Sequence, residues 1–307
     1  MVSAWARWLW GRTRENKAVP KSAPLEDRLA ALNDLRRDAA SPAARQELAK
    51  CLASKINLLA AKAARIVGEC KVEELRPQLV AAFERFLIRP ETTDRRSEAK
   101  LAIIKALEEM EYPSHEPFLL GIRHVQMEPT WTEPYRIDTA VELRALSALG
   151  LVRTNYPDVG VELVRLLADK EREARIGAVR AIAYWGTQAG ALLLRFKVLS
   201  GDQEAEVLGE CFSGLLHLEP ARSLELVAGY MENEDDAVAE SAALALGQSR
   251  REAAFEILKA HVDSKIRATV LLGIALLRTD AAIEYLRARL PDRDAAAALA
   301  IYKKDSA

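Results

Sequence analysis

The sequence predicts an all-α protein, an α-solenoid built as a right-handed superhelix of about seven to eight helical hairpins. Two features of the composition favour this class. Half of the 307 residues are hydrophobic, mostly Ala, Leu, Val and Ile, and aromatic residues make up only 6%. Gly (14 residues) and Pro (12 residues) are sparse, which argues against a β-rich chain with many tight turns. The third observation is an internal repeat.

The repeat is a helical stretch rich in small and apolar residues, clearest in Ala174–Gly186. Its copies start at Leu59, Ala99, Val141, Ala174, Val207, Val238 and Ile266. Successive starts are 40, 42, 33, 33, 31 and 28 residues apart. Periods of this size are typical of stacked helical repeats.

A second amphipathic stretch accompanies each copy. Clear examples are 159–167, 189–199, 221–231, 252–260 and 281–290. Pro157 and Pro220 stand just before two of these helices, where the missing backbone N–H costs little. Each repeat therefore reads as helix, short turn, helix. One such hairpin cannot bury its apolar face alone, so stacking of neighbours is expected to form one continuous core.

Over about residues 38–302 this pattern resembles the HEAT-repeat family, specifically the bacterial HEAT-like repeats of the phycobilisome-lyase type. Arg175 and Arg267 stand at the second position of their copies, and Lys100 replaces that arginine conservatively. Asp169 precedes Arg175 by six residues, which matches the Asp–Arg pair that ladders between repeats of the family. Other copies depart from the pattern, with Leu208 in place of the arginine. The resemblance implies second helices that line a concave, protein-binding surface.

The two ends of the chain lack the repeat pattern. Residues 1–24 form a basic segment with Trp5, Trp8 and Trp10, and residues 25–302 form the solenoid. Residues 303–307 are expected to fray. The tryptophan segment is short for a membrane anchor, so docking to a neighbour or disorder is the simpler interpretation, and contact with a membrane surface is the other.

No segment predicts a transmembrane helix or a signal peptide. The longest uncharged apolar stretch near the C-terminus, 268–277, has half the length of a membrane span. The three cysteines, an odd number without a CxxC spacing, favour a reducing compartment. We therefore expect a cytoplasmic protein.

Charge is distributed unevenly along the chain. The formal net charge is −1, but residues 1–200 carry +6, residues 201–263 carry −10 and residues 264–307 carry +3. The absence of a basic excess argues against a nucleic-acid partner. The acidic segment is either a solvated surface or a patch that steers a basic partner.

Two spacings between copies are wide, and the extra residues lie at 89–96 and 126–136. Both insertions fall inside a hairpin, so both are expected on one edge of the solenoid, which is often the binding side. The second contains Trp131, Tyr135 and Arg136 beside two prolines, and rigid surface aromatics are candidate interface anchors. The alternative is that Trp131 folds back over the core.

Basic residues recur on the second helices and could line the concave face as a row that binds an acidic peptide or nucleic acid. The alternative is a solvated face with pairing between repeats. The candidates are Lys100, Arg144, Arg175, Arg180 and Arg267, together with Arg65 and Lys105.

No catalytic signature and no cofactor site is predicted. There is no HExxH motif and no Cys/His cluster at zinc spacing. The HEAT-repeat di-iron enzyme deoxyhypusine hydroxylase uses several His-Glu dipeptides, and this chain has one, His115-Glu116. The HEAT-like alkylpurine DNA glycosylases place Asp, Arg and Trp on a basic concave face, but no motif here aligns with theirs, and Trp185 occupies a core position. Phycobilin lyases share the repeat, but this sequence contains no motif specific to that function.

The sequence therefore predicts a non-enzymatic scaffold that binds a protein partner through the second-helix face and the edge that carries the insertions. The alternative is a nucleic-acid-binding or DNA-repair solenoid similar to the alkylpurine glycosylases. Fold resemblance alone does not decide between these two functions.

Overall fold

The computed structural model describes residues 24–130 and 135–304. Within these ranges the chain is helical except for one two-stranded ribbon, and it divides into two compact units between Thr154 and Asn155. The predicted segment with Trp5, Trp8 and Trp10 lies outside the described residues, as does Trp131. No helix in the described ranges is both long and apolar enough to cross a membrane.

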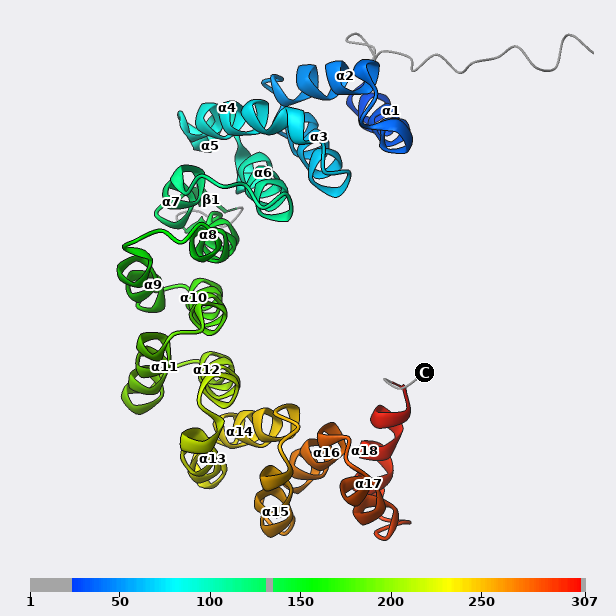
Figure 1. The fold of residues 1–307 in the computed structure, drawn as a ribbon, viewed down its shortest axis with the longest axis vertical. Coiled ribbons are helices and arrows are strands. Elements are labelled where there is room, and N and C mark those ends of the chain that lie inside the picture. The colour runs from blue at the N-terminus through cyan, green and yellow to red at the C-terminus, as the bar shows by residue number, and fades with distance from the viewer. Residues whose placement is uncertain (1–23, 131–134, 305–307) are drawn as a thin grey trace, which may run out of the picture. The chain divides into compact units, whose positions relative to one another are not determined.

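The first unit contains a leading helix, α1 (Leu25–Leu35), followed by three hairpins (Figure 1). The hairpins pair α2 (Pro42–Leu52) with α3 (Asn57–Glu69), α4 (Arg76–Leu87) with α6 (Glu98–Glu109), and α7 (Glu116–Ile122) with α8 (Val141–Arg153). Short 3₁₀ turns, η1 (Arg36–Asp38) and η2 (Glu73–Leu75), connect some of these helices.

The second unit contains five hairpins (Figure 1). They pair α9 (Val159–Leu167) with α10 (Arg172–Trp185), α11 (Gln188–Ser200) with α12 (Ala205–Leu218), α13 (Pro220–Gly229) with α14 (Asp236–Gln248), α15 (Glu252–Ala260) with α16 (Arg267–Leu277), and α17 (Asp280–Arg287) with α18 (Arg293–Lys304). A 3₁₀ turn, η4 (Tyr230–Glu232), extends α13.

The second helices form the packed spine of each unit. In the first unit α3 packs on α6 and α6 on α8, and in the second unit α10, α12, α14, α16 and α18 pack in sequence. Most first helices pack mainly on the second helix of their own hairpin, whereas α13 contacts both α12 and α14, and α17 contacts both α16 and α18. The described residues therefore form an all-α solenoid of eight hairpins, as the repeat spacing predicted.

Small residues explain how closely the spine helices approach. Gly247 of α14 faces Gly273 of α16, and a Cβ added at Gly247 would lie 2.3 Å from the Gly273 carbonyl oxygen. No side chain fits at such a distance, so the two backbones are in direct contact. The small residues of the second helices are thus needed for the close packing of this fold.

Hydroxyl side chains cap the N-termini of two helices, and a glycine lies at the C-terminus of a third. The hydroxyls of Thr187 and Thr279 accept hydrogen bonds from the N–H groups of Gly190 and Ala282 at the starts of α11 and α17. Gly186 ends α10 in the left-handed conformation, with φ of 69°, where a glycine costs least.

The structure differs from the sequence prediction at three places. Helix α17 ends at Arg287, three residues before the predicted end. The eighth second helix, α18, has no clear repeat motif and continues to Lys304, into the predicted frayed tail. The two insertions, expected as loops, contain regular structure: α5 (Pro90–Thr93) with the 3₁₀ turn η3 (Arg95–Ser97), and strands β1 (Met127–Pro129) and β2 (Arg136–Asp138).

Candidate protein-binding edge

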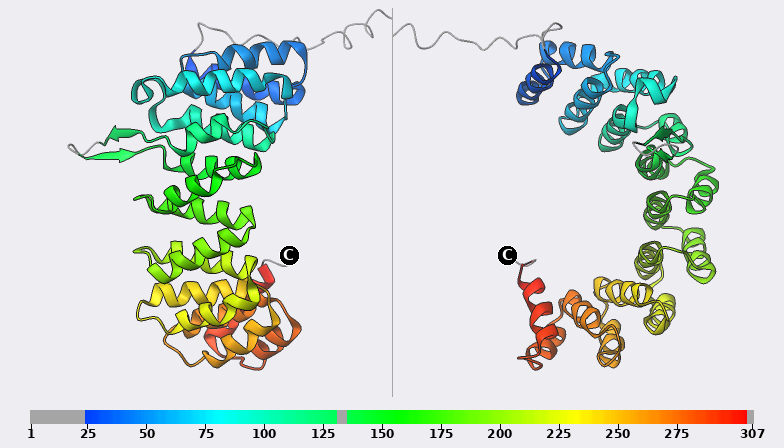
Figure 2. Two further views of the ribbon diagram at one scale, coloured as in Figure 1. Left: turned by 60° about the vertical axis from the view of Figure 1, so that its left-hand side comes forward. Right: turned by 180° about the vertical axis from the view of Figure 1, so that it is seen from behind.

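The two insertions lie against each other at one edge of the first unit. Strands β1 and β2 form an antiparallel ribbon in which Glu128 lies opposite Ile137. Figure 2 shows this ribbon projecting from the stack of helices. The backbone N–H of Arg96 donates a hydrogen bond of 2.7 Å to the carboxylate of Glu128, which joins the first insertion to the second. We call residues 88–97, 125–130 and 135–138 the loop edge.

Gln126 holds the base of the loop edge together. Its side chain is 1% exposed. Its amide nitrogen donates to the Asp94 carbonyl oxygen at 2.8 Å and to Glu128 Oε1 at 2.6 Å. Its amide oxygen accepts from the Ser97 hydroxyl at 3.1 Å. A buried amide with donors and acceptors all satisfied fixes the relative position of the two insertions.

Glu128 is the second buried group of this base, with 8% of its surface exposed. Besides Gln126 and the Arg96 N–H, its Oε1 accepts a hydrogen bond of 2.9 Å from the Thr139 hydroxyl. Thr139 begins the return from β2 to α8, so this carboxylate connects three segments. Donors on several sides compensate for the cost of burying its charge.

The backbone of the first insertion is strained. Arg89, Arg96 and Ser97 have φ values of 49°, 62° and 54°, in the left-handed region that residues other than glycine rarely adopt. Each costs about 1 kcal/mol or more and persists only where surrounding contacts determine the conformation. Here the bonds from Ser97 to Gln126 and from Arg96 to Glu128 supply those contacts.

Above this base, apolar side chains project into solvent. Ile88 is 63% exposed, Val125 54%, Tyr135 70% and Ile137 55%. Arg136, between the last two, pairs with Glu91 of α5 at 3.1 Å and donates to the Met127 carbonyl oxygen. Tyr135 and Arg136, two of the partner-binding residues expected from the sequence, are therefore exposed side chains of the loop edge.

The predicted basic row on the second helices has a different arrangement. Lys100 is 0% exposed and its ammonium lies 2.9 Å from Asp94 Oδ2. Arg144 is 3% exposed and lies 2.7 Å from Asp138 Oδ2. Both were expected on a binding face, and both are instead buried inside the first unit. A cation without contact to solvent offers no charge to a ligand on that face.

Burial, hydrogen bonds and the partner's charge all shift the pKa values of these paired groups. Burial lowers the pKa of Lys100, and the nearby Asp94 acts in the opposite direction. For Asp138 burial raises the pKa, but the N–H groups of Ala140 and Gln126 and the Arg144 guanidinium outweigh it, so the pKa lies below its usual value. Asp138 is therefore a carboxylate at neutral pH, and it orders both the ribbon and the start of α8.

Arg175 reaches across to the next hairpin. Its Nε and Nη2 each lie 2.8 Å from the carboxylate of Asp202, while Nη1 donates to the carbonyl oxygens of Asp169 and Lys170 at 3.0 Å. The expected partner of Arg175 was the Asp169 carboxylate. The bidentate pair with Asp202 instead links two neighbouring hairpins.

The remaining members of the predicted row carry carboxylate partners on the surface. The pairs are Arg65 with Glu98 (3.0 Å), Lys105 with Glu109 (4.0 Å), Arg180 with Glu210, and Arg267 with Asp292 and Asp294. All seven cations of the row are therefore matched within 4.0 Å. A surface whose cations are already paired is poorly suited to a phosphate backbone, which needs unpaired Lys and Arg.

Two histidines lie near α7. His115 directly precedes the helix, and His124 is a half-buried base whose pKa is lowered by burial and by the neighbouring Lys100. Burial raises the pKa of the Cys211 thiol to about 12, which removes it as a nucleophile. No group of three or more His, Cys, Asp or Glu side chains in the described part of the chain is arranged to hold a metal ion.

The comparisons with known proteins are distant. No protein-family model matches the sequence, and no curated protein matches it. Among solved structures, human deoxyhypusine hydroxylase in complex with glycerol is 19% identical, with 85% of this chain and 93% of that chain covered and a TM-score of 0.33. An engineered protein is 17% identical, with 92% and 97% covered and a TM-score of 0.33. Neither likeness bears on the activity of this chain.

Sequence reasoning missed the buried pairs of the first unit, although a signal was present. Asp94 precedes Lys100 by six residues, and Asp138 precedes Arg144 by six, the spacing already noted for Asp169 and Arg175. Gln126 had no such signal, because a polar residue in an insertion is ordinarily solvated. The exposed Ile88 was outside the predicted insertion by one residue.

Proposed function

We propose that this chain is a non-enzymatic scaffold that binds a protein partner at the loop edge. One observation carries the proposal: apolar side chains project from a base whose buried polar groups are mutually hydrogen-bonded. Tyr135 and Ile137 are 70% and 55% exposed, while Gln126 beneath them is 1% exposed. Surface apolar groups held on a rigid base lose little conformational entropy when a partner covers them.

The composition of the loop edge matches a protein interface better than a nucleic-acid interface. Tyrosine and arginine are enriched among the residues that dominate protein binding, and each such anchor contributes about 2 kcal/mol or more. Arg136 lies between Tyr135 and Ile137 and is already neutralised by Glu91. A rim with a paired charge around apolar anchors provides specificity without a strong phosphate-binding field.

A matched pull-down tests the proposal. The full chain and two variants are used as bait in lysate of the native host: Tyr135→Ser with Ile137→Ser, and Tyr184→Ser as the control. Tyr184 lies on α10 and is 54% exposed, so its loss removes a comparable surface side chain elsewhere. We expect a partner that the wild type and the control retain and the double variant loses. Equal recovery by all three baits would contradict the proposal.

A duplex-DNA titration separates this function from nucleic-acid binding. With the cations of the row paired, we expect no saturable binding of the full chain to duplex DNA at low salt. Tight binding that weakens steeply as salt is added would favour the nucleic-acid function, because release of counterions from phosphates produces that dependence.

A further inference from the structure

A second apolar surface lies on the first-helix side of the second unit, remote in sequence from the loop edge. In α11, Leu192 is 59% exposed, Phe196 70% and Leu199 67%. Their spacing of four and three residues places them on one stripe of the helix. On the preceding first helix, α9, Val161 and Val164 are 51% and 45% exposed. We call these five residues the α11 patch.

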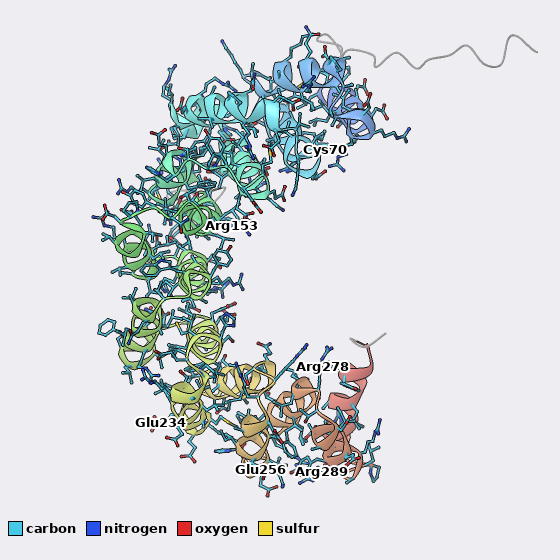
Figure 3. The ribbon with its side chains drawn as sticks, viewed as in Figure 1. Cys70, Arg153, Glu234, Glu256, Arg278 and Arg289 are labelled. Carbon is cyan, nitrogen blue, oxygen red and sulfur yellow. The ribbon has the colours of Figure 1, made fainter. Side chains whose placement is uncertain are left out.

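The position that Leu192 occupies is acidic in the later repeats. Leu192 lies five residues after Thr187, the N-cap of α11, and Glu284 lies five residues after Thr279, the N-cap of α17, so the two positions correspond. When the buried residues of α13 and α15 are aligned with those of α11, Glu225 and Glu256 occupy the same position. Glu256 is on the outer side of α15, away from α16 (Figure 3). The solenoid therefore does not require an apolar residue at the position of Leu192. The patch belongs to the two hairpins that contain α9 and α11.

The patch contains no charge that a partner would have to neutralise. The two cations of α11 are turned toward neighbouring elements: Arg195 donates to the Ser223 hydroxyl at 3.3 Å, and Lys197 lies 2.7 Å from Asp202. The other exposed residues of α11 are Gln188, Ala189 and Ser200, none of them charged. Such a face can pack against a copy of itself without burying like charges.

The cations on the helices beside α11 are already paired locally: Arg165 of α9 lies 2.9 Å from Glu162, and Arg222 of α13 lies 3.6 Å from Glu219. In the second unit α9, α11 and α13 follow one another on the side away from the spine (Figure 1). Arg165 of α9 has a side chain 64% exposed, and Glu225 of α13 is exposed. A two-fold axis parallel to α11 places α9 of one copy on the same side as α13 of the other. The proposed contact of α11 with α11 does not depend on a charge pair between the copies.

The area of the patch fits a small dimer interface. The exposed fractions of its five side chains amount to about 500 Å² for each copy, since large apolar side chains contribute roughly 150–250 Å² when complete. Two copies would bury about 1,000 Å² from the patch alone, close to the lower bound of specific interfaces. Contacts around the rim would add to this area.

We propose that the α11 patch is a homodimer interface, in which two copies of this chain pack α11 against α11. The interface is isologous, because the same surface of each copy faces its equivalent. Its area lies at the small end of specific interfaces, so we expect weak association. This inference does not depend on the function of the loop edge, because the two surfaces belong to different units.

Sedimentation equilibrium of the full chain from 2 to 200 µM tests the proposal. We expect a monomer–dimer equilibrium for the wild type. Phe196→Glu should weaken dimerisation at least 100-fold, because it places a charge in the centre of the interface, and Tyr184→Glu on α10 should leave it unchanged. Melting temperature and far-UV circular dichroism confirm that both variants are folded.

A second variant tests the edge of the patch. Leu192→Glu introduces the residue type that α17 carries at the aligned position and should weaken dimerisation about tenfold, whereas Glu256→Arg on α15 should have no effect. A wild type that remains monomeric at 200 µM would overturn the proposal. Retention of the wild-type equilibrium by folded Phe196→Glu would overturn it too, because it would place the dimer interface elsewhere.

Discussion

Buried ion pairs at the turns between first and second helices position the second helices of the solenoid. Asp94 accepts hydrogen bonds from the N–H groups of Ala99 and Lys100 and pairs with the Lys100 ammonium. The carboxylate thus caps α6 and neutralises a cation whose side chain is 0% exposed. Removing one partner of such a pair leaves an uncompensated buried charge, which costs more than the pair itself contributes.

Lys100→Met should therefore destabilise the first unit by about 3 kcal/mol, because the Asp94 carboxylate stays buried without its cation. The matched control is Lys105→Met on the same helix, whose side chain is 62% exposed. We expect that control to change the free energy of unfolding by less than about 0.5 kcal/mol. Urea unfolding of both variants measures the difference, and equal effects would show that the buried pair contributes nothing specific.

The pair between Arg175 and Asp202 predicts a pH dependence. Burial raises the pKa of Asp202, but hydrogen bonds from Arg175, Lys197 and the Glu204 N–H outweigh it, so the folded-state pKa lies below the usual value. The charged carboxylate therefore stabilises the fold above its unfolded-state pKa, about 4. This stabilisation is lost as the pH falls through the lower folded-state pKa.

Asp202→Asn should lower the free energy of unfolding by about 3 kcal/mol at pH 7, because Arg175 loses its anionic partner. The variant has no carboxylate to protonate, so the gap between variant and wild type should narrow at pH 3. Urea unfolding at the two pH values measures the gap. A gap that stays constant or widens toward pH 3 is incompatible with this assignment.

At the level of helices, the close approach of α14 and α16 sets the strictest packing requirement. Gly247→Ala places a methyl group against the Gly273 backbone and should destabilise the second unit by about 2–3 kcal/mol, because neither backbone can yield without moving a helix. Gly229 at the end of α13 is the control. A Cβ there meets nothing within 4 Å.

Gly229→Ala should be neutral or stabilise by about 0.5 kcal/mol, since alanine restricts the unfolded chain and suits a helix. Thermal unfolding of the two alanine variants compares them directly. A Gly247→Ala variant as stable as wild type would show that the α14–α16 contact is looser than described.

The sequence predicted the helices well and the insertions poorly. All seven predicted second helices are present. A spacing of apolar residues near 3.6 along the sequence predicts a helix without knowledge of the tertiary structure. Strands β1 and β2 carry no comparable signal, since three residues are too few for an alternating pattern. Their pairing depends on Gln126 and Glu128, whose hydrogen bonds join residues about 30 positions apart.

The same distinction applies to the candidate site. Tyr135 and Arg136 were expected on the surface because they belong to an insertion between the two helices of a hairpin, and both are exposed in the structure. Lys100 and Arg144 were predicted on a binding face because helical periodicity alone does not tell an exposed cation from a buried, paired one. That difference depends on where Asp94 and Asp138 lie, which only the fold determines.

At the scale of the whole molecule, the described residues present two apolar surfaces. The seven cations of the predicted row have carboxylate partners within 4.0 Å. The loop edge in the first unit and the α11 patch in the second differ in character. Tyr135 and Arg136 give the first a polar rim, and we propose a different protein as its partner, whereas the second is uncharged and we propose a second copy for it.

Site-specific photo-cross-linking from the loop edge tests the central claim most directly. A photoreactive phenylalanine analogue replaces Tyr135 in the full chain, and in a control it replaces Tyr184 on α10. In the native host, the account predicts a discrete adduct of higher mass from position 135, with a protein other than this chain, and none from position 184. An adduct from position 184 together with none from position 135 would contradict it.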